Sequence, residues 1–158
     1  MRIIKYNSKY ENDVKDLLVQ LQEHIVALDN WNLNIMTPEY REIYFKRMIK
    51  MCEGGVVLVA VENERAIGLI SGNVIKCDEE DKVFYKCPKS CEIYELIVSH
   101  NTRHGGVGGK LIEKIEDYFK KLGCEYCHVG VFEPNEMAKS FYDKHGYITR
   151  MRSLSKRL

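Results

Sequence analysis

The sequence predicts an α+β fold in which helices flank one mixed, mostly antiparallel sheet. Short β-branched runs, such as 56–61 and 92–98, alternate with longer segments whose apolar residues recur every three or four positions. Glycine-containing turns lie between them, most densely at 103–110. The expected order is β-α-α-β-β-β-α-β-α-β without an internal repeat, and the consecutive strands favour α+β over a regular alternation of strands and helices.

The first half of the chain has residue patterns that are typical of one strand, two helices and a β-hairpin. The hairpin joins two apolar runs through a short polar turn. In order, we expect a strand at 2–6, a helix at 8–28, a loop at 29–37, a helix that begins at Thr37-Pro38, and strands at 56–61 and 66–76.

The second half predicts two further strand-helix units and a final strand. A polar segment at 77–90 precedes them, and its acidic run at 78–81 is typical of a solvated loop, although it would also attract a cationic substrate. In order, we expect a strand at 92–98, a helix from Val107 to Leu122, a strand at 126–131, a short helix from Asn135, and a last strand from Tyr147 to Leu158.

Composition limits the classes of protein that fit this chain. The 158 residues, of which 45% are hydrophobic and 30% charged, suit a single domain over 1–158. Lys and Arg number 24 against 23 Asp and Glu, and the net charge of +1 argues against a nucleic-acid partner. Neither a signal-peptide pattern nor an apolar stretch of membrane-spanning length occurs. We therefore expect a cytoplasmic protein with no membrane partner.

Six cysteines are many for a chain of this length, and their spacing suggests a metal site. Cys124 and Cys127 are three residues apart in an expected strand, where their side chains would point to opposite faces and fail to chelate one ion. We expect no metal and six reduced thiols. The cysteines are Cys52, Cys77, Cys87, Cys91, Cys124 and Cys127.

The glycine-dense turn at 103–110 suits a phosphate-binding loop. The first amides of a helix lack intrahelical acceptors and carry the positive end of the helix dipole, and glycines let an anion approach them. A triphosphate P-loop would need glycine where His104 stands and Ser or Thr where Leu111 stands. A dinucleotide fingerprint would also need glycine in place of Leu111. A tight turn without a ligand is the remaining alternative to a third phosphate-binding pattern.

That third pattern is Arg-x-x-Gly-x-Gly, formed by Arg103, Gly106 and Gly108. In this form it resembles the pyrophosphate loop of the GCN5-related N-acetyltransferases (GNAT), which bind acetyl-coenzyme A. Two ordered signatures are more specific than one glycine loop. The second signature of the family is matched by Asn135, Ala138, Tyr142, Gly146 and Tyr147.

The resemblance covers essentially the whole chain and implies a GNAT-type fold whose sheet is splayed at the fourth strand. It implies acetyl-CoA as the cofactor, with the backbone of Ile97 and Val98 bonded to the pantetheine arm and Asn135 in contact with the cofactor arm. Tyr142 would lie near the thioester sulfur. The amides expected to hold the pyrophosphate belong to Arg103, His104, Gly105, Gly106, Val107, Gly108 and Gly109.

Acetyl transfer to an amine needs a base, because an alkyl ammonium of pKa ~10.4 is neutral in only about one molecule in 2,500 at pH 7. Glu92 and Glu95 on the fourth strand are the candidates. The two glutamates are three residues apart, so on a regular strand their side chains face opposite sides of the sheet. A bulge between them would place both on the same side. For either one, a sheet-edge or solvent-facing carboxylate is the alternative.

Two other groups would complete the chemistry. Tyr142 can donate its phenolic proton to the leaving thiolate, and the amide of Val98 can donate to the oxyanion. Without the second signature, Tyr142 would be interpreted as a core aromatic packed beside Phe141. The signature favours the catalytic interpretation.

The sequence therefore predicts an N-acetyltransferase that moves an acetyl group from acetyl-CoA to a primary amine by direct transfer in a ternary complex. A non-catalytic acyl-CoA binding or sensing module is the alternative. The partner would be a small-molecule or peptide amine, and by position Asp29 and Trp31 are candidates to contact it. The twelve residues from Tyr147 supply one long strand or two very short ones where many family members have two strands. This leaves an edge that is either blunted by Arg and Lys residues or paired with another subunit in a homodimer.

Overall fold

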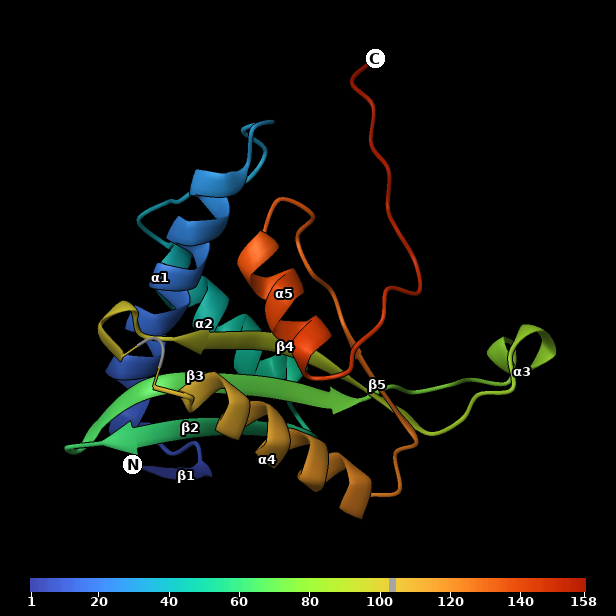
Figure 1. Ribbon diagram of the computed structural model, residues 1–158, viewed down its shortest axis with the longest axis horizontal. Coiled ribbons are helices and arrows are strands. Elements are labelled where there is room, and N and C mark those ends of the chain that lie inside the picture. The colour runs from blue at the N-terminus through green and yellow to red at the C-terminus, as the bar shows by residue number, and fades with distance from the viewer. Residues whose placement is uncertain (103–104) are drawn as a thin grey trace.

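Figure 1 shows the computed structural model of the chain, which describes residues 1–102 and 105–158. Helices cover both faces of a five-stranded sheet, so the predicted α+β class is confirmed. In chain order the elements are β1 (Arg2–Lys5), η1 (Ser8–Tyr10), α1 (Glu11–Leu28), α2 (Tyr40–Met51), β2 (Val56–Glu62), β3 (Arg65–Val74), α3 (Asp81–Phe84), β4 (Ser90–Val98), η2 (His100–Thr102), α4 (Val107–Lys121), β5 (Tyr126–Val129) and α5 (Glu136–Lys144). The second helix thus begins at Tyr40, after a turn, and not at Thr37-Pro38.

The sheet has the order β1-β2-β3-β4-β5, so neighbours in sequence are neighbours in space. β1 to β4 pair antiparallel, and β5 runs parallel to β4 because α4 carries the chain back between them. The β2–β3 turn lies at the predicted residues, where Asn63 and Glu64 both adopt left-handed conformations, with φ of 47° and 59°. Two such residues match the twist of hairpin strands.

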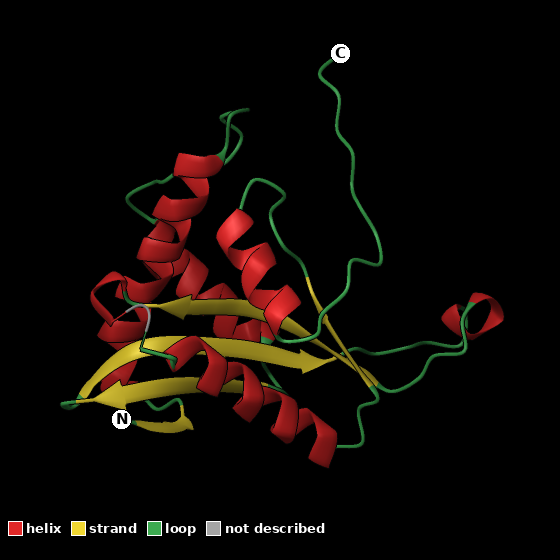
Figure 2. Cartoon of the chain, viewed as in Figure 1, coloured by secondary structure: helices red, strands yellow, loops and turns green. Residues whose placement is uncertain are grey.

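Helices lie on both faces of the sheet (Figure 2), and a hydrophobic cluster lies beneath them on each face. α1 and α2 cover one face through side chains such as Leu17 and Met48, which are 2% and 1% exposed. α4 covers the other face through Leu111 and Ile115, which are fully buried. α5 joins this second layer through Tyr142. No helix in the described part of the chain is long and apolar enough to cross a bilayer.

A one-residue bulge interrupts β4 where it pairs with β3. Ser71 pairs with Glu95, whereas the next residue, Gly72, pairs with Ile93. Tyr94 is therefore the extra residue on β4. From Glu95 onward the alternation of β4 side chains between the two faces is shifted by one position.

β4 and β5 separate halfway along β4. The two strands pair only from Ser90 with Tyr126 to Ile93 with Val129, whereas β4 continues to Val98. β5 ends at Val129, and the chain then leads to α5. Within the described sheet, the last residues of β4 have no strand on that side, which is the splay expected at the fourth strand.

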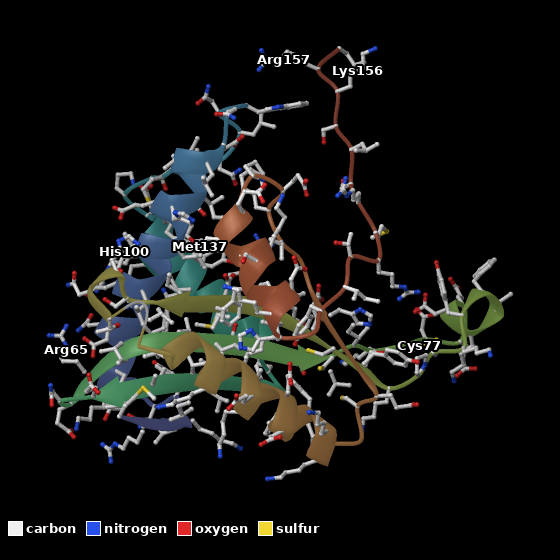
Figure 3. All side chains as sticks on the ribbon, in the orientation of Figure 1. Arg65, Cys77, His100, Met137, Lys156 and Arg157 are labelled. Carbon is white, nitrogen blue, oxygen red and sulfur yellow. A yellow bond between two sulfur atoms is a disulfide. The ribbon has the colours of Figure 1, made fainter. Side chains whose placement is uncertain are left out.

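The final strand expected from Tyr147 to Leu158 is wrong. Tyr147 packs against the core, but the following residues form no strand and extend away from the sheet to Lys156 and Arg157 (Figure 3). Leu154 on this tail is 91% exposed. A strand forms only where a neighbouring edge shares its hydrogen bonds, and the alternation of residue types along a segment does not specify that neighbour.

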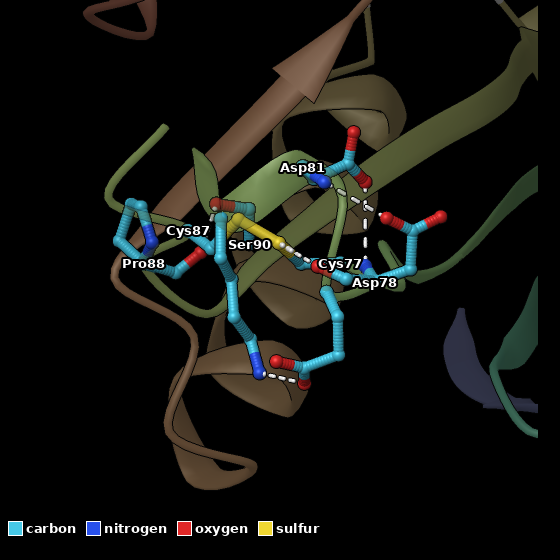
Figure 4. Close-up of a disulfide and its surroundings, with 8 residues drawn as sticks. Cys77, Asp78, Asp81, Cys87, Pro88 and Ser90 are labelled. Carbon is cyan, nitrogen blue, oxygen red and sulfur yellow. Dashed lines mark hydrogen bonds and ion pairs between the residues drawn. A yellow bond between two sulfur atoms is a disulfide. The ribbon is translucent and has the colours of Figure 1, made fainter. Parts of the chain in front are cut away.

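The expectation of six reduced thiols is wrong for Cys77 and Cys87, which form a disulfide (Figure 4). β3 and β4 pair antiparallel, and beyond their last pair the Ile75 N–H donates to the Ser90 carbonyl at 2.8 Å. The segment between the strands therefore returns on itself. It brings the two cysteines, ten residues apart in sequence, to a Cα separation of 6.1 Å, which suits a disulfide.

Cys124 and Cys127 do not share a strand. The expectation that their side chains point to opposite faces of one strand, and therefore cannot chelate one ion, rests on a wrong strand assignment. β5 begins at Tyr126, and Cys124 lies in the preceding turn, where its N–H donates to the Phe119 carbonyl at 3.0 Å. Both thiols pack against the cluster on the α4 face. Among residues 1–102 and 105–158, no group of three or more His, Cys, Asp or Glu side chains is placed to hold a metal ion.

Gly72 at the bulge has no room for a side chain, because a Cβ there would lie 2.5 Å from the Glu92 carbonyl oxygen and 3.2 Å from the Phe119 ring. We expect Gly72→Ala to lower the free energy of unfolding by about 2 kcal/mol or more. Urea unfolding measures this change. Gly130→Ala is the control, since a Cβ at Gly130 meets no atom within 4 Å. Equal stability of the two variants would contradict the close β3–β4 register.

Candidate active site

A cavity of about 220 Å³ lies where β4 leaves β5. α1 and α2 border it on one side, and α5 and the segment after β5 border it on the other. Three candidates from the sequence line this cavity, namely Glu95, Asn135 and Tyr142. The fold therefore brings residues from β4 and α5 together at the splay.

Glu95 is partly buried beside a tyrosine of α2. The hydroxyl of Tyr44 donates a hydrogen bond to Oε1 of Glu95. Burial raises the pKa of Glu95 to about 7, and the hydrogen bond opposes part of that rise because it stabilises the ionised form. A carboxyl with a pKa near neutrality can both accept and release a proton, as a general base requires.

The bulge places Glu92 on the same face as Glu95. Glu92 pairs opposite Asn73, and Glu95 opposite Ser71, and these two β3 residues are two positions apart. Both glutamates therefore face the α1–α2 side, instead of the opposite sides expected for a regular strand. Glu92 lies outside the cavity lining, which favours Glu95 as the base.

Sequence reasoning missed two tyrosines on α2. Tyr40 and Tyr44 both border the cavity, and their rings stack with centroids 4.9 Å apart and planes inclined by 11°. Burial raises the pKa of both phenols, and the charge of Glu95 adds to the rise, so both hydroxyls remain protonated near neutral pH. Their spacing of four residues places them on one helical face, a signal that core packing explains equally well.

Tyr142 and Asn135 belong to one structural unit on α5. The Asn135 side-chain oxygen accepts from the Ala138 N–H at 3.1 Å and caps the helix that carries Tyr142. Tyr142 is 8% exposed. Burial raises its pKa, and the charges of Cys127 and Glu95 contribute to the rise. Asn135 therefore fixes the start of the helix as well as lining the cavity.

The backbone of Val98 points toward the splay. The Ser99 N–H donates to the Ile67 carbonyl at 2.9 Å, so Ser99 and alternate residues before it exchange hydrogen bonds with β3. Ile97 belongs to this bonded set, and Val98, opposite Gly68, does not. The N–H and C=O of Val98 therefore face the side that β5 has left, whereas those of Ile97 face β3.

The predicted pyrophosphate loop leads into α4, although Arg103 and His104 lie outside the described residues. After Gly105, Gly106 forms the N-cap with a φ of 70°, a left-handed conformation that glycine adopts without strain. Among described residues, no side chain caps this helix. The amides of its first turn, with the helix dipole, suit an anionic group. In that turn the N–H groups of Val107, Gly108 and Gly109 lack an intrahelical acceptor, whereas the Lys110 N–H donates to the Gly106 carbonyl at 3.2 Å.

Two glycines of this turn have a packing role that sequence reasoning missed. A Cβ at Gly108 would lie 3.2 Å from the Phe141 ring, and one at Gly109 would lie 3.4 Å from Nε2 of His145. Nδ1 of His145 is in turn 2.8 Å from the Phe141 carbonyl oxygen. The glycines therefore let α5 pack closely against the first turn of α4, in addition to exposing the backbone.

The loop after α1 holds Asp29 in a structural position. Its carboxylate accepts hydrogen bonds of 2.7 to 2.9 Å from the backbone N–H groups of Trp31, Leu33 and Asn34 and from the Asn34 side chain. The bonds from Asn34 hold the pKa of Asp29 below its ordinary value. Neither Asp29 nor Trp31 lines the cavity, and Trp31 is 41% exposed.

The chain belongs to the acetyltransferase (GNAT) family, whose model matches residues 25–147. The matched range includes all of β4, α4 and α5, which together carry the splay, the glycine turn and Tyr142. The resemblance inferred from two short signatures is therefore confirmed at the level of the family.

Individual relatives are distant. An uncharacterized N-acetyltransferase from Archaeoglobus fulgidus is 29% identical over 99 residues, which span 63% of this chain and 63% of that protein. A mutant of the BH1408 protein from Bacillus halodurans has a TM-score of 0.77 at 22% identity, over 100% of this chain and 99% of that one. The aminoglycoside N-acetyltransferase AAC(6')-Iy in complex with CoA has a TM-score of 0.68 at 14% identity, over 99% and 98%. At these identities the solved structures establish the fold alone.

The raised pKa of Glu95 makes stability depend on pH. In the unfolded chain a glutamate titrates at ~4.3, whereas the folded protein keeps the Glu95 proton up to about pH 7. The stabilisation from that proton is complete below the unfolded pKa and is lost as the pH rises through the folded one. We expect Glu95→Gln to gain about 3 kcal/mol of unfolding free energy relative to the wild type between about pH 4 and about pH 8. Denaturant titrations across this range measure the gain, and a pH-independent difference would contradict it.

Proposed function

We propose that this protein transfers an acetyl group from acetyl-CoA to a primary amine by direct transfer in a ternary complex. The observation that carries the proposal is the cavity at the splay, where the partly buried Glu95 and the buried Tyr142 border one space. Membership of the acetyltransferase family supports the reaction class. AAC(6')-Iy, which shares the fold, is described in complex with CoA and with a bisubstrate analog, which supports binding of both substrates together.

The described residues fit coenzyme A at two places. The uncapped amides at the start of α4 suit its pyrophosphate. The C=O of Val98 suits an N–H of its amide-containing arm, which would occupy the side that β5 has left. When bound, acetyl-CoA supplies the acetyl group as a thioester.

Ionised Glu95 takes a proton from the ammonium group of the acceptor, which frees the nitrogen to attack, and the nitrogen loses its second proton to solvent once it has bonded to the acetyl carbon. The acceptor arrives as an ammonium ion of pKa ~10.4, and an ordinary carboxyl of pKa ~4.3 would accept its proton poorly. The pKa of about 7 lowers the cost of this transfer by about 3 kcal/mol. Tyr44 orients the carboxylate through its hydrogen bond. Glu92, outside the cavity lining, has no part in this step.

Val98 and Tyr142 stabilise the charges that develop during transfer. The N–H of Val98 donates to the carbonyl oxygen as it becomes negative. Tyr142 donates a hydrogen bond to the sulfur as the bond between carbon and sulfur breaks. A phenol of pKa ~10 is already a weaker acid than a thiol of pKa ~8.5, and burial raises the pKa of Tyr142 further, so Tyr142 keeps its proton and solvent protonates the thiolate.

A non-catalytic acyl-CoA sensing module would use the same cofactor contacts. It would have no use for a carboxyl that titrates near neutrality beside the cavity, which is the observation that favours the enzyme. A screen of primary amines with detection of free thiol separates the two functions. Tight CoA binding without thiol release for any amine class would support the sensor.

We expect Tyr142→Phe to lower kcat by about 10-fold to 100-fold, the contribution of one hydrogen bond to a charged group. Thiol release under saturating acetyl-CoA measures the loss. Tyr147→Phe is the matched control, because its hydroxyl bonds to Glu116 at 2.9 Å and lies outside the cavity lining. Unchanged kcat in Tyr142→Phe would remove Tyr142 from the mechanism.

We expect the kcat/KM of the wild type to fall as the pH drops below about 7, because Glu95 becomes protonated. Glu95→Gln should lose about 100-fold or more in kcat/KM at neutral pH and should also lose this acidic limb. A pH-rate profile of both proteins tests the assignment. An acidic limb that persists in Glu95→Gln would show that another group is the base.

A further inference from the structure

We infer that the acceptor is a primary amine that carries one positive charge on an uncharged, largely apolar body. The inference rests on the proposed acetyl transfer and concerns the walls of the cavity around Glu95. It follows from the number of charges these walls can balance and from the surface they present to the rest of the acceptor.

Glu95 is the one group with a charge near neutral pH among the described residues that line the cavity. The lining in the described ranges includes neither Lys, Arg or His nor a second carboxylate, and Gln22 and Asn135 contribute neutral amides. Burial raises the pKa of every tyrosine in the lining, so the phenols remain neutral. These tyrosines are Tyr40, Tyr44, Tyr94 and Tyr142.

Most of the remaining wall is apolar or aromatic. Leu21 and Ile25 of α1 and Phe132 of the segment after β5 border the cavity. The stacked Tyr40 and Tyr44 add aromatic surface beside the carboxyl to which Tyr44 is bonded. Aromatic faces attract a cation and also cover apolar carbon. Glu95 would balance the charge of an ammonium next to it, and these side chains would cover an apolar body.

The described cavity lining has no groups to balance the charges of an acceptor that carries further charged groups. A polyamine or an aminoglycoside brings additional ammonium groups, and the described lining offers them no second carboxylate. A free amino acid brings a carboxylate, which would meet Glu95 without a cationic partner. An unpaired charge removed from water is costly, so an extra ammonium would have to lose its proton, an extra carboxylate would have to gain one, or the acceptor binds poorly.

The size of the cavity restricts the acceptor further. Its volume of about 220 Å³ is smaller than the roughly 300–1,000 Å³ of pockets for drug-sized ligands. The space therefore suits one small body, on the scale of a single ring or a short branched chain.

A set of four amines tests the inference on the full chain. 2-Phenylethylamine carries one ammonium, phenylalaninamide adds a neutral group, phenylalanine replaces it with a carboxylate, and spermidine carries several ammonium groups. We expect kcat/KM for the first two to exceed the values for the last two by at least about 10-fold. Equal or higher values for phenylalanine or spermidine would overturn the inference.

Calorimetry in the presence of CoA separates failure of this inference from failure of the proposed function. Preferential binding of 2-phenylethylamine and phenylalaninamide without acetylation of any amine would support the acceptor class and overturn the catalytic proposal. Equal binding of all four amines would overturn the acceptor class whatever the rate of transfer.

A change of one cavity residue should alter the preference in a defined direction. Gln22→Glu introduces a second carboxylate into the lining, and we expect the ratio of kcat/KM for spermidine to that for 2-phenylethylamine to rise by about 10-fold. Ala27→Glu is the matched control, since it adds the same charge to an exposed position of α1 outside the cavity. An unchanged ratio in folded Gln22→Glu, or an equal rise in both variants, would overturn the inference.

Discussion

β4 is bonded to β3 along its length and to β5 over only its first four residues, and this asymmetry decides where the cavity lies. A strand held firmly on one side presents the backbone groups of its other side at fixed positions. Because β5 leaves at Val129, the groups of Val98 face open space and not a neighbouring strand. The bulge at Tyr94 then turns Glu95 toward α2, and the cavity forms between the two helical layers.

Burial and hydrogen bonding shift the pKa of Glu95 in opposite directions, and their balance sets the pH at which its carboxyl loses a proton. Burial alone favours the protonated carboxyl, whereas the hydroxyl of Tyr44 favours the ionised form. The stack of Tyr40 on Tyr44 covers the site with groups that have no charge of their own near neutral pH. In the proposed reaction, a single carboxyl in neutral surroundings would both tune the base and limit the charge of the acceptor, so reactivity and selectivity would share one physical cause.

The start of α4 combines two features in neighbouring glycines. Gly106 adopts a left-handed conformation at the helix start, which leaves the first amides free of a side-chain cap from described residues. Gly108 and Gly109 bring α5 within contact of that start through Phe141 and His145. The helix that offers an anion site is thereby packed directly against the helix that carries Tyr142.

The sequence by itself determined the α+β class, the hairpin at Asn63 and Glu64, and the two signatures that identify the family, because these depend on local periodicity, turn conformation and short spacing. Other features depend on pairing between distant segments, which local patterns do not encode. The missing last strand, the Cys77–Cys87 disulfide and the bulge at Tyr94 are of this kind. The tertiary structure alone brought Tyr44 to Glu95, because side chains from α2 and β4 meet only after the helix has packed on the sheet.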